Sequence, residues 1–264
     1  MHLGKTGKDI KSWKSFSRDV RGTQECLLGR LDEFPDSVLV TGCQRSGGTM
    51  LSHLITNSAG MVNYWSGGDD ELDAALLLSG QTPHEPRGRY CFQTTYLNER
   101  LSEYFEHPAH YIIWLLRNPH SVVYSMVYNW KRFALNELFL QCGYVEMDYR
   151  DRVRFQRFGI LGVPPLRRAA YSYNGKVSQV FKLREGYAKD RLIVLDYDNL
   201  IRAKERLLPI LYERIHLAYD SGYAESISEY SLNKKDCLRD REKELIDTVC
   251  MPIYNAALKL VNLV

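Results

Sequence analysis

A glycine-rich stretch between two apolar segments holds the residues whose types and spacing indicate chemistry most clearly. Positions 42–49 read Gly-Cys-Gln-Arg-Ser-Gly-Gly-Thr and contain three glycines and one cation, Arg45. Glycines let the backbone turn tightly and present consecutive N–H groups, and the helix expected next directs its partial positive charge at the same turn. The stretch predicts an anion site, most often for phosphate, although such glycines can also serve only to turn the chain.

The spacing departs from the mononucleotide-binding loop at one position. Gly42, Gly47 and Thr49 are in register with G-x-x-x-x-G-K-[ST], but Gly48 stands where the lysine should be. ATP and GTP hydrolases place that lysine on the terminal phosphates. Its absence argues against nucleotide hydrolysis and leaves Arg45 as the cation of the loop.

A second polar element follows a second apolar run. Residues 111–116 read Tyr-Ile-Ile-Trp-Leu-Leu, Arg117 comes directly after them, and Pro119 suits the first turn of a helix. Ser125 lies about two turns into that helix, which we expect over 120–130. Arg117 and Ser125 are therefore expected to reach one phosphate group.

The elements that must position these residues alternate between strand and helix. Apolar runs at 37–41, 111–116 and 192–196 predict buried parallel strands, and 89–96 reads as a further strand. Helical spacing begins again at 49–55, after the glycine-rich turn. The pattern predicts an α/β fold of three layers, with a mainly parallel sheet flanked by helices and the anion site at the carboxyl ends of the strands.

Taken together, the motifs resemble those of the sulfotransferase superfamily, whose donor is 3'-phosphoadenosine 5'-phosphosulfate (PAPS). Residues 44–49 resemble its 5'-phosphosulfate loop, residues 117–119 with Ser125 match its 3'-phosphate element, and residues 191–200 resemble its later strand ending in Tyr-Glu-Asp-Leu. The resemblance implies the P-loop NTPase-like sulfotransferase fold. It also implies that 3',5'-bisphosphate (PAP) is the nucleotide product.

The resemblance assigns donor contacts residue by residue. The implied set is Arg45, Ser46, Gly47, Gly48, Thr49, Met50, Arg117, Ser125, Tyr197, Lys234 and Lys235. Gly48 replaces the usual threonine or serine, and Met50 stands where some members place a tryptophan that stacks on adenine. Lys234 or Lys235 would reach the 3'-phosphate from a late loop. Arg45 is also the expected catalytic cation, because it would stabilise the departing 5'-phosphate.

The position at which cytosolic sulfotransferases carry a catalytic histidine holds a different residue here. Cytosolic sulfotransferases end one strand in Lys-Thr-His, whereas positions 93–95 here read Gln-Thr-Thr, so Thr95 cannot be the base. Several members of the superfamily carry an acidic base close to where Asp69, Asp70 and Glu71 stand. We rank these three first as a group, and the histidines behind them in the order His84, His53.

The length and composition of the chain indicate how many domains it forms. The 264 residues, 45% of them hydrophobic, suffice for one α/β domain. We expect a helical N-terminal extension over 1–36 and a single sulfotransferase domain over 37–264, with an insertion at about 131–174. By resemblance, this insertion shapes the acceptor pocket, although a helical lid with a charged outer face is equally compatible with its aromatics and arginines.

The net charge and the cysteine content indicate the class of binding partner and the cellular compartment. A net charge of +3 is too small to argue for nucleic acid, and six cysteines without CxxC or zinc-type spacing favour a reduced intracellular setting. No signal-peptide core or membrane-spanning run is evident, which favours a cytoplasmic enzyme. The expected partner is a small-molecule or carrier-bound acceptor, sulfated on a hydroxyl or amine.

Two other functions stay open. A non-catalytic nucleotide-binding protein of the same fold would explain why Thr95 stands at the position of the catalytic histidine. A magnesium-dependent nucleotide kinase would use Asp196 or Asp198 as metal ligand. The sulfotransferase reaction itself needs no metal, because arginines meet the charge that magnesium would neutralise.

Overall fold

Four parallel strands form the centre of the computed structural model, which describes residues 10–263 except for the side chains of residues 229–231 and 235. The strands are β1 Val38–Gly42, β2 Cys91–Gln93, β3 Tyr111–Leu116 and β4 Leu192–Asp196, in the order β2-β1-β3-β4. Every pairing is parallel. The expected parallel sheet is confirmed, but the strand predicted over 89–96 is shorter than expected.

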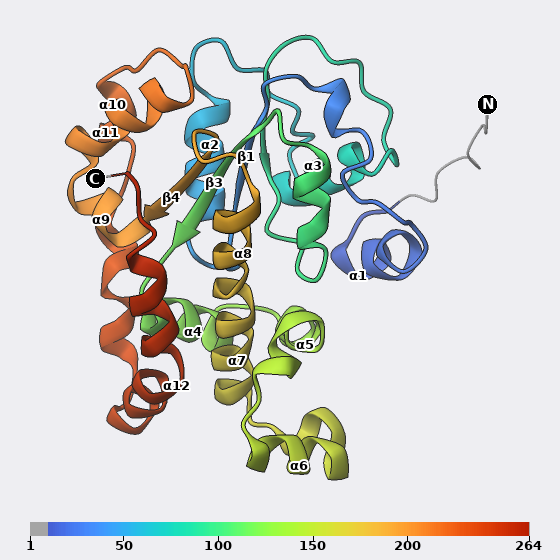
Figure 1. Ribbon diagram of the computed structural model, residues 1–264, viewed down its shortest axis with the longest axis vertical. Helices are drawn as coiled ribbons and strands as arrows, with labels where there is room; N and C mark the ends of the chain where they lie inside the picture. The colour runs from blue at the N-terminus through green and yellow to red at the C-terminus, as the bar shows by residue number, and fades with distance from the viewer. Residues whose placement is uncertain (1–9, 264) are drawn as a thin grey trace.

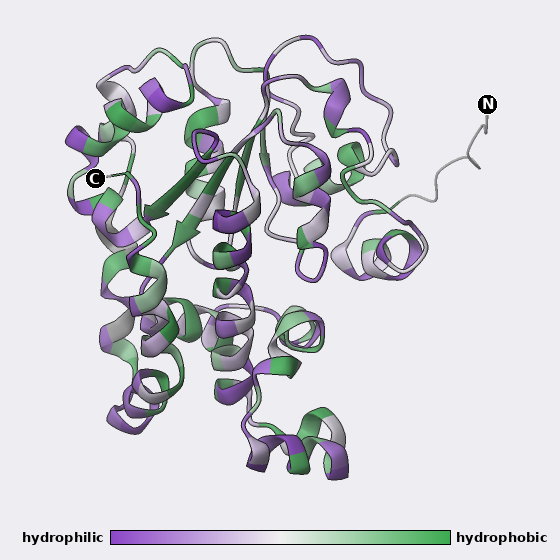
Figure 2. Ribbon diagram, viewed as in Figure 1, coloured by the Kyte–Doolittle hydropathy of each residue, from purple (hydrophilic) through white to green (hydrophobic). Residues whose placement is uncertain are grey.

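The sheet is buried on both faces, which explains why its strands read as continuous apolar runs. All residues of β1, β2 and β3 are buried, and the strands are green throughout most of their length in Figure 2. Leu39 and Ile112 belong to a core on one face, whereas Val40 and Ile113 belong to a core on the other. The three expected layers are therefore present.

Helices cover both faces of the sheet (Figure 1). Their bounds are α1 Trp13–Phe16, α2 Gly48–Thr56, α3 Asp70–Leu78, α4 Pro119–Tyr128, α5 Arg132–Leu138, α6 Tyr149–Phe158, α7 Pro165–Val177, α8 Gln179–Gly186, α9 Tyr197–Arg202, α10 Lys204–Arg214, α11 Gly222–Glu225 and α12 Asp240–Leu258. The helices α2, α9, α10 and α11 pack on the face that includes Val40. The opposite core receives α3, α4, α5, α7, α8 and α12.

The N-terminal segment contributes to the second of these cores. Phe16, Val20, Leu28 and Phe34 are all fully or almost fully buried there, beside the side chains of the sheet. The segment thus packs against the same face as α3.

Within the part of the chain that the structure describes, no helix combines the length and the hydrophobicity needed to cross a bilayer.

Candidate functional site

The turn between β1 and α2 has the strand–turn–helix form that its glycines predict. Gly42 and Gly47 adopt φ values of 130° and 100°, which L side chains rarely adopt. A Cβ on Gly47 would lie 2.1 Å from the ring of Tyr197, so only glycine fits beneath that ring. Arg45 also has a left-handed backbone, at φ 71°. The turn therefore packs directly against Tyr197, the first residue of α9.

Arg117 lies at the carboxyl end of β3, with only 3% of its side chain exposed. Its Nη1 donates to the carbonyl of Arg45 at 3.2 Å, and its guanidinium lies 4.5 Å from the centre of the Tyr197 ring. Its Nε is 3.6 Å from a carboxylate oxygen of Asp198, whose other oxygen accepts from the backbone N–H of Asn118. The ends of β1, β3 and β4 are thus joined through one guanidinium.

Ser125 reaches the same place from α4. Asn118 caps this helix by accepting from the N–H of His120 at 2.9 Å, and Pro119 occupies its first turn. The Nε of Arg45 donates to the hydroxyl of Ser125 at 3.0 Å. Arg45 therefore contacts both Ser125 and Arg117, which come from the second motif.

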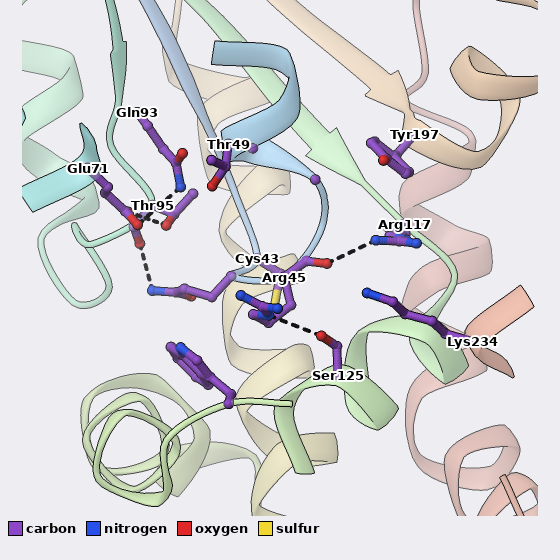
Figure 3. A pocket seen from close by; sticks show the side chains of 14 residues that line it. Cys43, Arg45, Thr49, Glu71, Gln93, Thr95, Arg117, Ser125, Tyr197 and Lys234 are labelled. Carbon is purple, nitrogen blue, oxygen red and sulfur yellow. Dashed lines mark hydrogen bonds between the residues drawn. The ribbon is translucent and has the colours of Figure 1, made fainter. Parts of the chain in front are cut away.

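These residues line a cavity of about 250 Å³. Its walls include Arg45, Gly47, Gly48, Thr49, Glu71, Thr95, Arg117, Ser125, Trp130, Tyr197 and Lys234. Figure 3 shows the side chain of Lys234 beside Arg117, with its amino group directed toward Arg45. Three cations from three different segments therefore share one small cavity.

The electrostatics of this cavity favour an anion. Burial lowers the pKa of Arg45, and the charge of Arg117 lowers it further. Burial likewise lowers the pKa of Lys234, as do the charges of Arg117 and Arg45. Like charges held together away from water raise the free energy of the protein until an opposite charge enters. The site is suited to a ligand that carries several negative charges.

Not every predicted donor residue lines the cavity. Ser46 is buried, with its N–H donating to the carbonyl of Cys43 at 3.1 Å, and it does not line the cavity. Met50 packs against the core on the α2 face and is likewise absent from the walls. The side chain of Lys235 lies outside the described residues. The tryptophan-like stacking position therefore has no counterpart at Met50 in this cavity.

A larger cavity of about 750 Å³ adjoins the first. Both cavities share Gln44, Arg45, Thr49, Glu71 and Trp130. The remaining walls of the larger cavity come from the N-terminal segment, the start of α3 and the α5 region, and include Trp13, Arg21, Asp69, Asp70, Tyr96, Lys131, Phe133 and Glu137. The part of the predicted insertion after Leu138 lies outside these walls, and α6 projects away from the body of the molecule (Figure 1).

Two of the three candidate carboxylates have partners outside the smaller cavity. Asp69 caps α3 by accepting from the N–H of Leu72 at 3.1 Å, and it accepts from the indole N–H of Trp13 at 2.9 Å. Asp70 lies 3.2 Å from the Nε2 of His53. Both line only the larger cavity.

Glu71 alone among the candidate acids lines both cavities. One of its carboxylate oxygens accepts from the hydroxyl of Thr95, and the other accepts from the Nε2 of Gln93 at 3.1 Å (Figure 3). Burial raises the pKa of Glu71 to about 8, and the charges of Asp69 and Asp70 raise it too, whereas the Thr95 hydrogen bond lowers it. A carboxyl group with this pKa can exchange a proton near neutral pH.

The candidate histidines lie elsewhere. The Nε2 of His84 is 3.0 Å from the hydroxyl of Tyr90, and the residue lines neither cavity. His53 stacks against Trp65, with 4.0 Å between ring centres, and it also lines neither cavity. The structure therefore brings Arg45 and Glu71 together but does not bring either histidine to them.

Two further residues, one in the cavity walls and one behind them, were missed from the sequence. Trp130 lies in the walls of both cavities, and its only signal was its place at the end of the helix expected over 120–130. Lys176 is 1% exposed, and its Nζ donates to the carbonyl of Thr95 at 3.1 Å. Burial lowers its pKa. Nothing in its sequence setting distinguishes Lys176 from a surface lysine of a helix.

Comparisons with known proteins identify the fold. No protein-family model matches the chain, and no curated protein matches it by sequence. The crystal structure of a sulfotransferase from Alicyclobacillus acidocaldarius has a TM-score of 0.52 and 13% identity, over 87% of this chain and 97% of that one. Mouse sulfotransferase SULT7A1 complexed with PAP has a TM-score of 0.51 and 12% identity, over 90% of this chain and 94% of that one. The chain therefore has the fold of the sulfotransferase superfamily.

Proposed function

We propose that the protein is a sulfotransferase that moves a sulfuryl group from PAPS to a hydroxyl or amine of a small-molecule or carrier-bound acceptor. The observation that carries this proposal is the convergence of Arg45, Arg117 and Lys234 on one cavity. PAPS carries two separated anionic groups, which match a site with cations on more than one wall. The complex of mouse SULT7A1 with PAP, a structure of the same fold, supports this choice of donor.

The donor would bind across the carboxyl ends of β1 and β3. Arg45, the N–H groups of the turn and Thr49 would hold the 5'-phosphate, and Arg117 with Ser125 would hold the 3'-phosphate. Sulfuryl transfer is expected to resemble phosphoryl transfer, with an in-line, loose transition state in which the leaving phosphate gains charge. Catalysis then consists largely of positioning and of charge stabilisation by Arg45.

The acceptor would bind in the larger cavity, whose volume falls in the range of small-molecule sites. Its aromatic walls suit a ring-bearing or amphipathic acceptor. Glu71 would take the proton of the acceptor as the new bond to sulfur forms and the bond from sulfur to the 5'-phosphate oxygen breaks, which leaves PAP. Glu71 and Arg45 line both cavities, which supports these roles, because donor and acceptor would meet there.

Binding of PAP without magnesium tests the donor assignment. At one hundred times its Kd, a ligand specific for the folded state adds about 2.7 kcal/mol of stability, which raises the Tm by roughly 5–10 °C for a chain of this size. Arg117→Ala should abolish the shift, whereas Arg87→Ala, whose side chain is 79% exposed, should retain it. If ATP with magnesium stabilised the protein and PAP did not, the result would instead support the alternative function of a magnesium-dependent nucleotide kinase.

Transfer of labelled sulfate from PAPS tests catalysis across a panel of phenols, alcohols and amines. Transfer to any acceptor excludes the non-catalytic alternative. Stabilisation by PAP with no transfer across the panel would favour a nucleotide-binding protein without sulfotransferase activity.

A further inference from the structure

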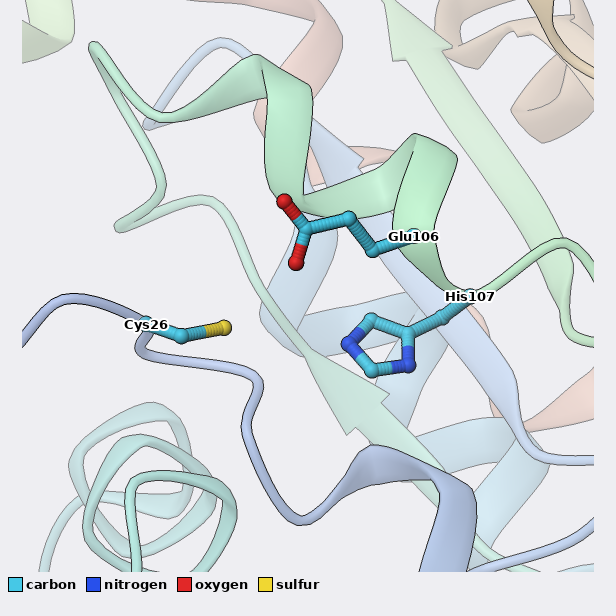
Figure 4. A group of neighbouring side chains, drawn as sticks. All are labelled: Cys26, Glu106 and His107. Atoms are coloured by element: carbon cyan, nitrogen blue, oxygen red, sulfur yellow. The ribbon is translucent and has the colours of Figure 1, made fainter.

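We propose that Cys26, Glu106 and His107 form a binding site for Zn²⁺, separate from both cavities. Cys26 belongs to the N-terminal segment, whereas Glu106 and His107 lie at the end of a 3₁₀ turn, Leu101–Glu106, between β2 and β3. One ligand atom from each residue lies within 4.8 Å of the others. Figure 4 shows the sulfur, the carboxylate and one ring nitrogen facing a common space.

His107 is prepared for metal binding by its neighbour. The residue is 7% exposed, and its Nδ1 lies 2.8 Å from the carboxylate of Asp32. A hydrogen on Nδ1, donated to Asp32, leaves the lone pair on Nε2, and metal-binding histidines commonly have such a carboxylate partner. Within the described residues, that Nε2 is buried without a hydrogen-bond partner. A buried nitrogen without a hydrogen-bond partner destabilises the fold, and a metal bond would supply that partner.

The thiol of Cys26 is held next to the same space. Its Sγ donates to a carboxylate oxygen of Glu103 at 3.1 Å, and that oxygen also accepts from the backbone N–H of Leu28 at 2.8 Å. Zn²⁺ would replace the thiol proton: the S–H bond breaks, a zinc–sulfur bond forms, and one proton leaves to the solvent. Glu103 keeps its backbone donor after this exchange, so no acceptor is left without a partner.

The chemistry and the spacing of the group suit zinc. Thiolate sulfur, imidazole nitrogen and carboxylate oxygen are its usual ligands, and bonds of about 2.0–2.3 Å place ligand atoms about 3.6 Å apart in a tetrahedral site. Closing the group from 4.8 Å requires movement of about 1 Å. The side chain of Glu106 is exposed and free to make most of it. Water would occupy the fourth position.

Bound zinc would link the N-terminal segment to the body of the fold. Cys26 follows α1 and Arg21 in the chain, and both Trp13 and Arg21 line the larger cavity. A metal at Cys26 would therefore hold in place a segment that forms one wall of that cavity. The proposal does not depend on sulfotransferase activity, because the metal would act on the segment itself.

Titration of metal-free, reduced protein with Co²⁺ tests the site directly. We expect one equivalent to bind, with a thiolate-to-cobalt charge-transfer band and the visible bands of tetrahedral Co²⁺, all lost when Zn²⁺ displaces it. Cys26→Ser should remove the charge-transfer band, whereas Cys237→Ser, at an exposed free cysteine, should leave it unchanged. Asp32→Asn should weaken binding by about 10–100-fold, the usual effect of losing the partner of a ligating histidine.

Stability supplies a second readout. Zn²⁺ should raise the Tm of the wild-type protein and release one proton from Cys26 per metal bound, and it should do neither in Cys26→Ser. Circular dichroism of that variant establishes that it folds. A charge-transfer band that survives Cys26→Ser, an equal Tm increase with Mg²⁺ or Ca²⁺, or the absence of any Zn²⁺ effect on the wild-type protein would each overturn the site.

Discussion

Replacing Glu71 by glutamine should make the protein more stable and less active at the same time. The carboxyl group is partly buried, and burial raises its pKa from the usual 4.5 to about 8. Its two oxygens accept hydrogen bonds from Thr95 and Gln93. The new amide keeps one accepting oxygen for Gln93, and the hydroxyl of Thr95 can rotate to accept from its NH₂ group. The main change is therefore the loss of a group that ionises unfavourably in the folded state.

The size and sign of the effect follow from proton linkage. Between pH 4.5 and about 8, folded Glu71 retains a proton that the unfolded chain has lost, so stability falls as pH rises through this window. At about 1.4 kcal/mol per pKa unit the loss reaches roughly 5 kcal/mol as an upper bound, because partial exposure to water screens the charge. The variant lacks this loss. Its stability should match that of the wild type at pH 4.5 and exceed it by about 2–5 kcal/mol at pH 9.

Urea unfolding at pH 4.5, 7 and 9 measures this difference. Glu85→Gln is the matched control, because the Glu85 side chain is 90% exposed and lies outside both cavities. The Glu71 variant should also lose about 10²–10⁴-fold in sulfate transfer, and the wild-type kcat/KM should rise with pH up to about 8. If the two proteins showed the same pH dependence of stability, Glu71 would not be the ionising group. Unchanged activity would remove it as the base.

Substitutions in the turn and at its neighbours should also change activity and stability. Arg45→Ala should reduce sulfate transfer by about two to three orders of magnitude, the usual effect of losing one preorganised charge stabiliser, and near-normal turnover would refute its role. Gly47→Ala should destabilise the fold by about 1–3 kcal/mol, because the added Cβ meets the Tyr197 ring. The same variant should lose the Tm increase that PAP causes. An unchanged Tm of the ligand-free variant would contradict this geometry. In the wild-type protein, the hydrogen bond from Thr95 lowers the pKa of Glu71. Thr95→Val removes this bond, so the pKa should rise and the rising limb of the pH–rate profile should move to higher pH. Thr95→Ser keeps the hydroxyl and should retain the profile. Coincident profiles for Thr95→Val and the wild type would exclude that role.

The sheet was predictable where strands are buried on both sides. The run at 111–116 forms β3 with the predicted bounds, because six apolar residues in succession satisfy both cores. The strand predicted over 89–96 forms only at Cys91–Gln93, because β1, its partner in the sheet, pairs with it over residues 38–40 alone. Its length depends on the neighbouring strand, which local sequence does not reveal.

The site was predictable where motifs follow strands directly. Arg45 and Arg117 come together because β1 and β3 are neighbours and their carboxyl ends meet at one edge of the sheet. The choice among Asp69, Asp70 and Glu71 was not predictable. Consecutive residues at a helix start point in different directions, and the rotation of α3 is set by tertiary contacts such as that between Asp69 and Trp13.

The proposed base and the proposed donor influence each other through charge. The charge of Glu71 raises the pKa of Arg45, so each group affects the ionisation of the other. Without a donor, the positive charge of Arg45 favours the ionised form of Glu71 and limits its affinity for a proton. PAPS would neutralise that excess of positive charge and raise the pKa of Glu71. The carboxylate that remains ionised in the ternary complex would then be a stronger proton acceptor, which couples removal of the acceptor proton to the presence of the donor.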